Sequence, residues 1–453
     1  MITQSIFKAN DIRGVFGGPH AEWDAEGAAA IGAAYVQVFG LVGREFVMSR
    51  DMRVSGPEVA AAFAEGARSQ GASVVDAGLA STDELWYASG SLGLPGVQFT
   101  ASHNPPEYNG IKFCLPGAAP IDPASLTAVR DVAVSGSLTP AAEPGTTREI
   151  DILQGYADYL RSLVDLAGLR PLKVVVDAGN GMAGLTTDAV LGPLGLTIVG
   201  LYLDLDGRFP HHMPNPLIPE NLVDAQAAVR EHGADVGLVF DGDADRCFII
   251  DERGEVVPPS VVTAMIAEQE LAREPGGTIV INKITSRAVG ERVASLGGRL
   301  VVSRVGHTSM KAHMAAEGAI FGGEHSAHYY FREFWGADTG MLAGLHVLSL
   351  LGQGTATMSQ LADRFGGYAA SGEINSTVSD VAAVLASVRA AFADRGVADD
   401  DDGVTITGED WWVNVRASNT EPLVRLNVEA RQENTMAALR DEALAIIQGG
   451  THE

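Results

Sequence analysis

Short apolar runs alternate with alanine-rich stretches of helical period along most of this 453-residue chain. This alternation is typical of α/β proteins, in which buried strands and covering helices follow one another. Three of the apolar runs are followed by polar turns, which indicates three similar units. A chain of this length is also too long for one hydrophobic core, so we expect three or four domains. The runs that we expect to be strands are residues 46–48, 97–99, 173–176, 236–240 and 278–281.

The last part of the chain has a different pattern. Residues 411–415 and 423–428 alternate like two paired strands, with a polar loop between them and a helix after them. We interpret the acidic run 399–402 as a solvated loop of this unit. The sequence thus predicts an α/β protein of four domains, three similar mixed α/β units and a smaller α+β unit. The predicted domains are residues 1–150, 151–252, 253–366 and 367–453.

The charge of the chain excludes several classes of partner. It has 31 Lys and Arg residues against 57 Asp and Glu residues, a formal net charge of −26. Such a field repels phosphate backbones and anionic lipids, so we expect no nucleic-acid and no membrane partner. The first residues lack a signal-peptide pattern, and the longest apolar stretch, 341–351, is too short to span a bilayer. We therefore expect a cytoplasmic protein.

A serine stands in a stiff loop after the predicted strand 97–99. Two prolines follow Ser102 and His103 closely and restrict the backbone there. Further on, Asn109-Gly110 is a strong hairpin signal, and a hairpin there folds Lys112 back toward the serine. A hydroxyl with a histidine and a lysine nearby suits phosphoryl transfer. The alternative is a serine that caps a helix.

Three aspartates follow the predicted strand 236–240. Asp241, Asp243 and Asp245 alternate with small residues, so their carboxylates can converge on one hard cation. Magnesium is the natural ion for such oxygen ligands. An EF-hand is disfavoured because Arg246 stands where its sharp turn needs glycine. The remaining alternative is a solvated acidic turn.

Residues 323–331 read as an extended segment. With a period of two, Glu324, Ser326 and His328 share one face and offer a carboxylate, a hydroxyl and a proton carrier to a sugar. The alternative is that the aromatic residues after them simply form part of a core.

The loop between the last two predicted strands is a candidate anion site. Backbone N–H groups in such a turn, together with arginine and hydroxyl side chains, form an anion-binding nest, whereas a plain hairpin loop is the alternative. The candidate residues are Arg416, Ser418, Asn419, Thr420 and Arg425. Arg13, Lys283 and His307 also stand next to turns, but each of them taken alone favours a structural role.

Together these stretches resemble the α-D-phosphohexomutase superfamily. TASHNP at 100–105, DGDADR at 241–246, GEHSAH at 323–328 and RASNTEP at 416–422 match its serine, metal, sugar and phosphate loops, in the family order. The resemblance covers nearly the whole chain. It implies four domains around a central active-site cleft, with a mobile fourth domain.

The resemblance also implies a role for each matching residue. Ser102 is similar to the phosphoserine, and its phosphate is expected on Mg²⁺ together with Asp241, Asp243 and Asp245. The expected catalytic residues are Ser102, His103, Lys112, Arg246 and His307, with His307 and Lys112 as proton handlers. The expected substrate-binding residues are Arg13, Lys283, Glu324, Ser326, His328, Arg416, Ser418, Asn419, Thr420 and Arg425. These basic residues lead us to expect a locally positive pocket in an acidic protein.

The resemblance implies a reaction in two steps. Phospho-Ser102 donates its phosphoryl group to a hexose phosphate, and the hexose 1,6-bisphosphate formed reorients and returns the other phosphate. The sugar loop is similar to that of the phosphomannomutase/phosphoglucomutase branch, although Ala327 and His325 stand where that branch commonly has Gly and Met. We expect activity on mannose phosphate, possible activity on glucose phosphate, and a monomer or weak homodimer. The alternatives are a phosphoglucosamine mutase, a metal-dependent sugar-phosphate phosphatase and a non-catalytic binding protein.

Overall fold

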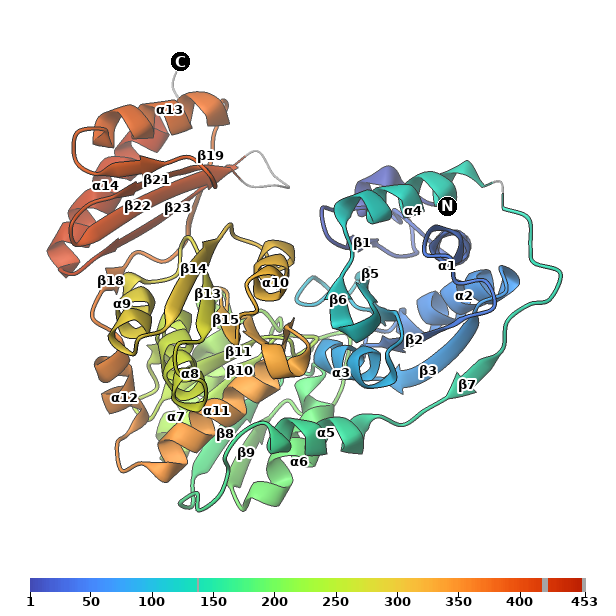
Figure 1. The fold of residues 1–453 in the computed structure, drawn as a ribbon, viewed down its shortest axis with the longest axis horizontal. Helices are drawn as coiled ribbons and strands as arrows, with labels where there is room; N and C mark the ends of the chain where they lie inside the picture. Colours follow the sequence, from blue (N-terminus) through green and yellow to red (C-terminus); the bar gives the residue numbers. More distant parts are fainter. Residues whose placement is uncertain (137, 418–422, 450–453) are drawn as a thin grey trace.

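The described strands of the chain form four sheets, which follow one another along the sequence (Figure 1). The structure is a computed structural model and describes residues 1–136, 138–417 and 423–449. Each of the first three sheets contains a set of three neighbouring parallel strands, with an antiparallel strand beside the last of them in the chain. In the first sheet the short segment Thr147–Glu149 adds a fourth parallel strand. This repetition confirms the prediction of three similar units. No helix in these described ranges is long and apolar enough to cross a membrane.

The first sheet has the strand order β1-β5-β4-β2-β3-β7, with β6 beside β5. Its strands are β1 (Ile12–Val15), β2 (Glu45–Arg50), β3 (Ser73–Leu79), β4 (Gly96–Phe99), β5 (Tyr108–Leu115), β6 (Ala119–Pro120) and β7 (Thr147–Glu149). Its helices are α1 (Ala25–Val38), α2 (Gly56–Ser69), α3 (Thr82–Leu92) and α4 (Pro123–Ser135). Helices α1, α2 and α4 pack over one hydrophobic core with the sheet, whereas α3 turns toward the second and third units.

The second sheet has the order β12-β11-β10-β8-β9 and the third the order β14-β13-β15-β16-β17. The strands of these two sheets are β8 (Lys173–Asp177), β9 (Thr197–Leu201), β10 (Val236–Phe240), β11 (Cys247–Asp251), β12 (Val256–Val257), β13 (Thr278–Asn282), β14 (Arg299–Ser303), β15 (Phe321–Gly323), β16 (Tyr329–Phe331) and β17 (Ala337–Asp338). The helices are α5 (Leu153–Ser162), α6 (Ala183–Leu191), α7 (Val223–His232), α8 (Pro259–Arg273), α9 (Arg287–Ser295), α10 (His307–Ala316), α11 (Gly340–Gln353) and α12 (Met358–Phe365). One continuous core joins both sheets and reaches α3 of the first unit.

The C-terminal unit has a core of its own. Its sheet has the order β18-β23-β22-β21-β20, with β19 beside β23. The elements are β18 (Ala369–Ala370), β19 (Ile374–Thr377), α13 (Val381–Phe392), β20 (Val397–Asp399), β21 (Val404–Thr407), β22 (Trp411–Ala417), β23 (Leu423–Ala430) and α14 (Glu433–Gly449). The described residues of this core form a cluster separate from those of the first three units, and the contacts of this unit with the third unit include polar ones, such as Arg431 with Glu291.

The acidic run 399–402 is exposed, as the sequence predicts, with the side chains of Asp399, Asp400 and Asp401 about half accessible to solvent, but it also contacts another unit. It lies against the third unit, where Asp399 and Asp401 approach Lys283 Nζ to 2.5 and 3.4 Å. Asp401 also pairs with Arg304 at 2.6 Å, and Asp402 accepts a hydrogen bond of 2.7 Å from the backbone N–H of Val305. The run therefore connects the C-terminal unit to the third sheet, a contact that no local sequence pattern can reveal.

The start of α3 buries two carboxyl groups. Glu84 accepts hydrogen bonds from Ser81 through one oxygen, and its other oxygen has no partner within the described part of the chain. Burial, assisted by the charge of Asp83, raises the pKa of Glu84 to about 8 from an ordinary 4.5. The folded chain therefore keeps a proton here between about pH 4.5 and 8 that the unfolded chain releases.

We expect the free energy of unfolding to fall as the pH rises through this window, by up to about 1.4 kcal/mol per pH unit for one proton. Glu84→Gln keeps the neutral form at every pH, so this slope should largely disappear. Urea unfolding of both proteins at pH 5, 6, 7 and 8 measures the difference. Parallel stability curves for the two proteins would contradict the assignment.

Candidate active site

The three predicted functional loops occupy the same place in their units. Each loop joins the third parallel strand of its unit to the antiparallel strand that follows: β4 to β5, β10 to β11 and β15 to β16. The carboxyl ends of parallel strands meet at one edge of a sheet, so loops of this kind are natural carriers of a site. The repeat thus presents three chemically different loops from equivalent positions.

Ser102 stands in the β4–β5 loop in a strained conformation. Its φ is +50°, in the left-handed region that costs a residue with a side chain about 1–2 kcal/mol. Its backbone N–H donates to Thr100 Oγ1 at 2.8 Å. The hydroxyl is buried and lies 2.9 Å from Asp241 Oδ2 and 3.2 Å from His103 Nδ1. The loop therefore points the serine hydroxyl at the aspartate cluster.

Arg53 holds this loop in place, and the sequence analysis missed it. Its guanidinium is buried and donates hydrogen bonds of 2.7–2.9 Å to four loop carbonyls, those of Ser102, Asn104, Pro105 and Tyr108. The carboxylate of Asp51 lies 3.3 Å from its Nε. The only sequence signal for Arg53 was the polar turn after the predicted strand 46–48. Nothing in that turn indicated a contact with a loop some fifty residues later.

The hairpin predicted at Asn109-Gly110 is wrong. Both residues lie inside β5, between β4 and β1, and the chain reverses earlier, in the serine loop. Glycine is needed at 110 because a Cβ there would come within 2.3 Å of the Ile12 carbonyl oxygen. Pairing of β5 with β4 still places Lys112 opposite Gln98 and beside the aspartates.

The aspartate trio forms a compact, buried set of oxygen atoms. One ligand atom each of Asp241, Asp243 and Asp245 lies within 4.8 Å of the others. Oδ1 of Asp243 and Oδ1 of Asp245 are buried and have no hydrogen-bond partner among the described residues. Unpartnered buried carboxylate oxygens are costly unless a cation takes them up. The trio therefore fits a hard divalent cation with oxygen ligands, as the sequence predicts.

Two basic side chains stabilise this negative charge. Lys112 Nζ lies 2.7 Å from Asp243 Oδ2 and 2.6 Å from Asp245 Oδ2, and Arg246 donates to Asp241 Oδ2 at 2.9 and 2.8 Å. Burial by itself lowers the pKa of Lys112, but Asp243 and Asp245 outweigh this and raise the pKa. Lys112 is therefore a cation at neutral pH.

A cavity of about 130 Å³ opens beside the serine between the first three units. Its walls contain all five predicted catalytic residues, Ser102, His103, Lys112, Arg246 and His307, and two of the predicted substrate-binding residues, Arg13 and His328. It is not the positive pocket that we expected, because Asp11, Asp245 and Asp338 balance its lysine and arginines. The walls are nevertheless far less negative than the protein as a whole.

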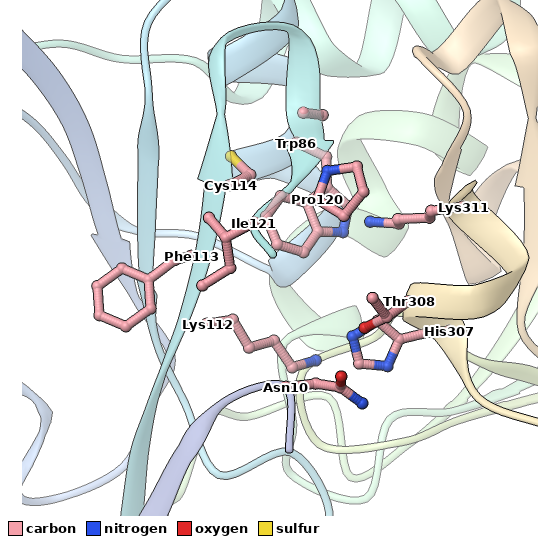
Figure 2. Close-up of a pocket in the computed structure, with 11 residues that line it drawn as sticks. Asn10, Trp86, Lys112, Phe113, Cys114, Pro120, Ile121, His307, Thr308 and Lys311 are labelled. Carbon is pink, nitrogen blue, oxygen red and sulfur yellow. The ribbon is translucent and has the colours of Figure 1, made fainter. Parts of the chain in front are cut away.

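An adjoining pocket continues from this cavity along the junction of the first and third units. Figure 2 shows Lys112 of β5 and His307 of α10 with their nitrogen atoms pointing toward one another, below Trp86 and Lys311. Burial lowers the pKa of His307, although Asp338 acts in the opposite direction. Burial also lowers the pKa of His103 well below its ordinary value. Both imidazoles are therefore neutral at pH 7 and able to accept a proton.

The sugar loop is a tight turn and not the extended segment that we expected. The backbone N–H of Glu324 donates to the carbonyl of His328 at 3.0 Å, and Ala327 has a φ of +65°. The turn still brings the predicted residues together, with Ser326 Oγ 3.0 Å from His328 Nδ1. One Glu324 oxygen accepts from the hydroxyl of Tyr330 at 2.6 Å. The positive φ gives the physical reason why glycine suits position 327.

The two arginines of the phosphate loop converge on an acidic residue. Glu373, just before β19, lies 2.6 Å from Arg416 and 3.4 Å from Arg425. Ser418, Asn419 and Thr420 lie outside the described residues.

Three predicted substrate-binding residues stand apart from the serine. Arg416 and Arg425 belong to the C-terminal sheet, and Lys283 pairs with the acidic run, so none of these three lines the cavity at Ser102. The cavity at Ser102 is thus lined by residues of the first three units, whereas Lys283 of the third unit and Arg416 and Arg425 of the C-terminal unit lie outside its walls.

Comparison with known proteins decides the family. The four models of the phosphoglucomutase/phosphomannomutase family match in order, α/β/α domain I at 4–137, domain II at 154–254, domain III at 258–368 and the C-terminal domain at 373–446. The chain belongs to this family. A phosphomannomutase of Salmonella typhimurium is 39% identical over 98% of this chain and 99% of that protein.

Two further relatives agree with this phosphoglucomutase/phosphomannomutase assignment. A protein of Xanthomonas campestris named phosphohexose mutases is 38% identical over 99% of this chain and all of that protein. The crystal structure of a family member from Burkholderia thailandensis matches 100% of this chain and 99% of that chain, with a TM-score of 0.91 and 32% identity. Membership confirms the predicted fold and the predicted class of enzyme, an intramolecular phosphotransferase.

Proposed function

We propose that this protein interconverts hexose 1-phosphates and hexose 6-phosphates, with Ser102 as the carrier of the phosphoryl group. The observation that carries the proposal is the Ser102 hydroxyl, held in a strained loop 2.9 Å from a buried carboxylate trio at the cavity. Phosphoryl transfer depends mainly on positioning and charge, and a rigid serine beside a cation site offers both.

The reaction begins on phosphorylated Ser102. The bond between Ser102 Oγ and phosphorus breaks while the free hydroxyl of the hexose phosphate bonds to the same phosphorus. Neutral His307 takes the proton of the sugar hydroxyl, and Lys112 gives a proton to the leaving Ser102 oxygen. The hexose 1,6-bisphosphate then reorients, and the reverse transfer returns its other phosphate to Ser102. Both proton carriers are restored at the end of the cycle.

The remaining residues bind and orient. Mg²⁺ held by Asp241, Asp243 and Asp245 would supply positive charge to the phosphate on Ser102. Arg13, His103 and Arg246 surround that phosphate, while Glu324, Ser326 and His328 bind the sugar hydroxyls. The C-terminal unit rotates onto the bound substrate to give a closed form of the protein. In this closed form the substrate is also bound by Lys283, Arg416, Ser418, Asn419, Thr420 and Arg425.

The proposed substrate is mannose phosphate, with glucose phosphate as a second possibility. The 39% identity to the Salmonella typhimurium phosphomannomutase supports this choice. The test is conversion of the 1-phosphates of mannose, glucose and glucosamine to the 6-phosphates, with Mg²⁺ and a trace of hexose 1,6-bisphosphate as activator. Turnover of glucosamine phosphate alone would favour a phosphoglucosamine mutase instead.

Arg416 distinguishes a mutase from a sugar-phosphate phosphatase. A mutase holds the non-reacting phosphate of its substrate at a remote site. Arg416→Ala removes one charge-assisted hydrogen bond to that phosphate and should therefore raise KM by about 10- to 100-fold. Steady-state kinetics with mannose 1-phosphate measures this change. The exposed Arg440, paired with Asp441 on α14, provides the control Arg440→Ala, which should leave KM unchanged. An unchanged KM in Arg416→Ala would favour the phosphatase.

We further propose the domain boundaries near residues 150, 252 and 366. The ranges of the four family models, which leave out 138–153, 255–257 and 369–372, support them. We also propose a cytoplasmic monomer or weak homodimer. The net charge of −26 supports the further proposal that it has no nucleic-acid or membrane partner.

A further inference from the structure

The first turn of α3 contacts the metal-binding loop of the second unit directly. Thr82, the first residue of this helix, is fully buried. Its backbone N–H donates to the carbonyl oxygen of Asp243 at 3.0 Å, and its Oγ1 donates to Asp243 Oδ2 at 2.6 Å. One threonine thus binds both the backbone and the side chain of a predicted metal ligand that lies 161 positions later.

These contacts give the two oxygens of the Asp243 carboxylate different environments. Oδ2 accepts hydrogen bonds from Thr82 and Lys112, whereas the buried Oδ1 has no partner among the residues that the structure describes. Donors on one oxygen fix the plane of a carboxylate and leave the other oxygen available to a cation. Asp243 is therefore oriented before any metal ion arrives.

A bound cation affects the two hydrogen-bond donors to Asp243 Oδ2 differently. Lys112 carries a positive charge on a flexible stem and is shared with Asp245, so a divalent ion in the trio repels it. Thr82 is neutral, its β-branched side chain is stiff, and its backbone is part of a helix. The orientation of Asp243 that persists when the cation binds therefore depends on Thr82.

The helix start that carries Thr82 is itself fixed by all of the first three units. Ser81 and Glu84 form a capping box that closes the first turn of α3. The neighbouring Asp83 accepts hydrogen bonds of 2.6 Å from the hydroxyls of Tyr156 and Thr339, in the second and third units. A change in the angle of the C-terminal unit leaves this junction intact, because none of the described residues of that unit contributes to it.

We propose that Thr82 is a positioning residue that sets the metal affinity of the site through Asp243. The proposal rests on the proposed function, which assigns Asp243 as a ligand. Partners that orient metal ligands typically contribute 10- to 100-fold to metal affinity. Loss of the Thr82 hydroxyl should therefore weaken binding of a divalent cation by about 10-fold or more.

The experiment titrates the full-length protein with Mn²⁺ and follows the free ion by electron paramagnetic resonance, without substrate. Thr82→Val should raise the Kd for Mn²⁺ by about 10-fold or more, whereas Thr82→Ser, which keeps the hydroxyl, should bind within about twofold of the original protein. Thr82→Ala is the second variant, because a valine methyl group has little room at 2.6 Å from a carboxylate oxygen. Either variant decides the question if it folds.

The matched control is Thr187→Val on α6. Thr187 is also buried and donates to a helix carbonyl at 2.6 Å. Its loss should lower stability without changing the Kd for Mn²⁺. An unchanged Kd in Thr82→Val or Thr82→Ala overturns the proposal, provided that Asp243→Asn abolishes binding. If the original protein itself binds no Mn²⁺, the proposed metal site fails and this proposal fails with it.

Discussion

Ser102→Ala removes the proposed phosphoryl carrier, and we expect kcat to fall by about 10⁴- to 10⁶-fold, the loss that follows removal of a nucleophile in other enzymes. No other hydroxyl in the described chain combines burial at the cavity with a 2.9 Å contact to Asp241. A side chain without oxygen cannot store the phosphate between the two halves of the reaction. Conversion of mannose 1-phosphate, with hexose 1,6-bisphosphate added, measures the loss.

Intact mass provides a second and independent measurement. Incubation with hexose 1,6-bisphosphate should add one phosphate to the original protein and none to Ser102→Ala. Ser125→Ala, at the exposed start of α4, is the control and should be phosphorylated and active. Normal turnover by Ser102→Ala, or a phosphate on another residue, would contradict the assignment of the carrier.

Arg53→Met should give the second large effect, a loss of about 3–5 kcal/mol in the free energy of unfolding. It leaves the buried Asp51 without its partner and takes the donor away from four loop carbonyls. The serine loop then loses the support that keeps Ser102 at a φ of +50°. Urea unfolding measures the stability, and we expect kcat to fall in the protein that remains folded.

Two further variants separate the causes. Arg53→Lys keeps the positive charge but not the planar fork that reaches several carbonyls, so its stability and kcat should lie between those of the original protein and Arg53→Met. Arg148→Met removes a half-exposed arginine paired with Glu45 and should cost less than about 1 kcal/mol. Native stability together with native kcat in Arg53→Met would show that the loop holds its shape without Arg53.

The features that could be predicted from the sequence are those that a short stretch of chain specifies. The predicted strand 236–240 is found unchanged as β10, and the trio after it converges as expected. Consecutive apolar residues specify a buried strand, and aspartates that alternate with small residues in a turn can bring their carboxylates together. The serine loop was located for the same reason, because its two prolines restrict the backbone locally.

The wrong predictions involve turns whose shape depends on neighbouring strands. Asn109-Gly110 carries a hairpin signal, yet β1 and β4 pair with both sides of this segment and hold it as a strand. Residues 323–331 contain an extended pattern, but the return of β16 along β15 forces a turn at Ala327. The acidic run 399–402 is exposed as predicted, but its contacts with Lys283 and Arg304 were missed because these partners are about a hundred residues away.

The sequence by itself determined which groups we propose for the chemistry of this protein: a serine, a carboxylate trio, a sugar loop and an anion loop, each encoded in a few consecutive residues. Only the tertiary structure decided how these groups are held. Arg53 supports the serine loop, Thr82 orients Asp243 and Glu373 pairs with the arginines of the phosphate loop. Each contact joins residues about 40 to 160 positions apart. The folded sheets bring these residues together, and a short stretch of sequence does not show which distant residues become its neighbours.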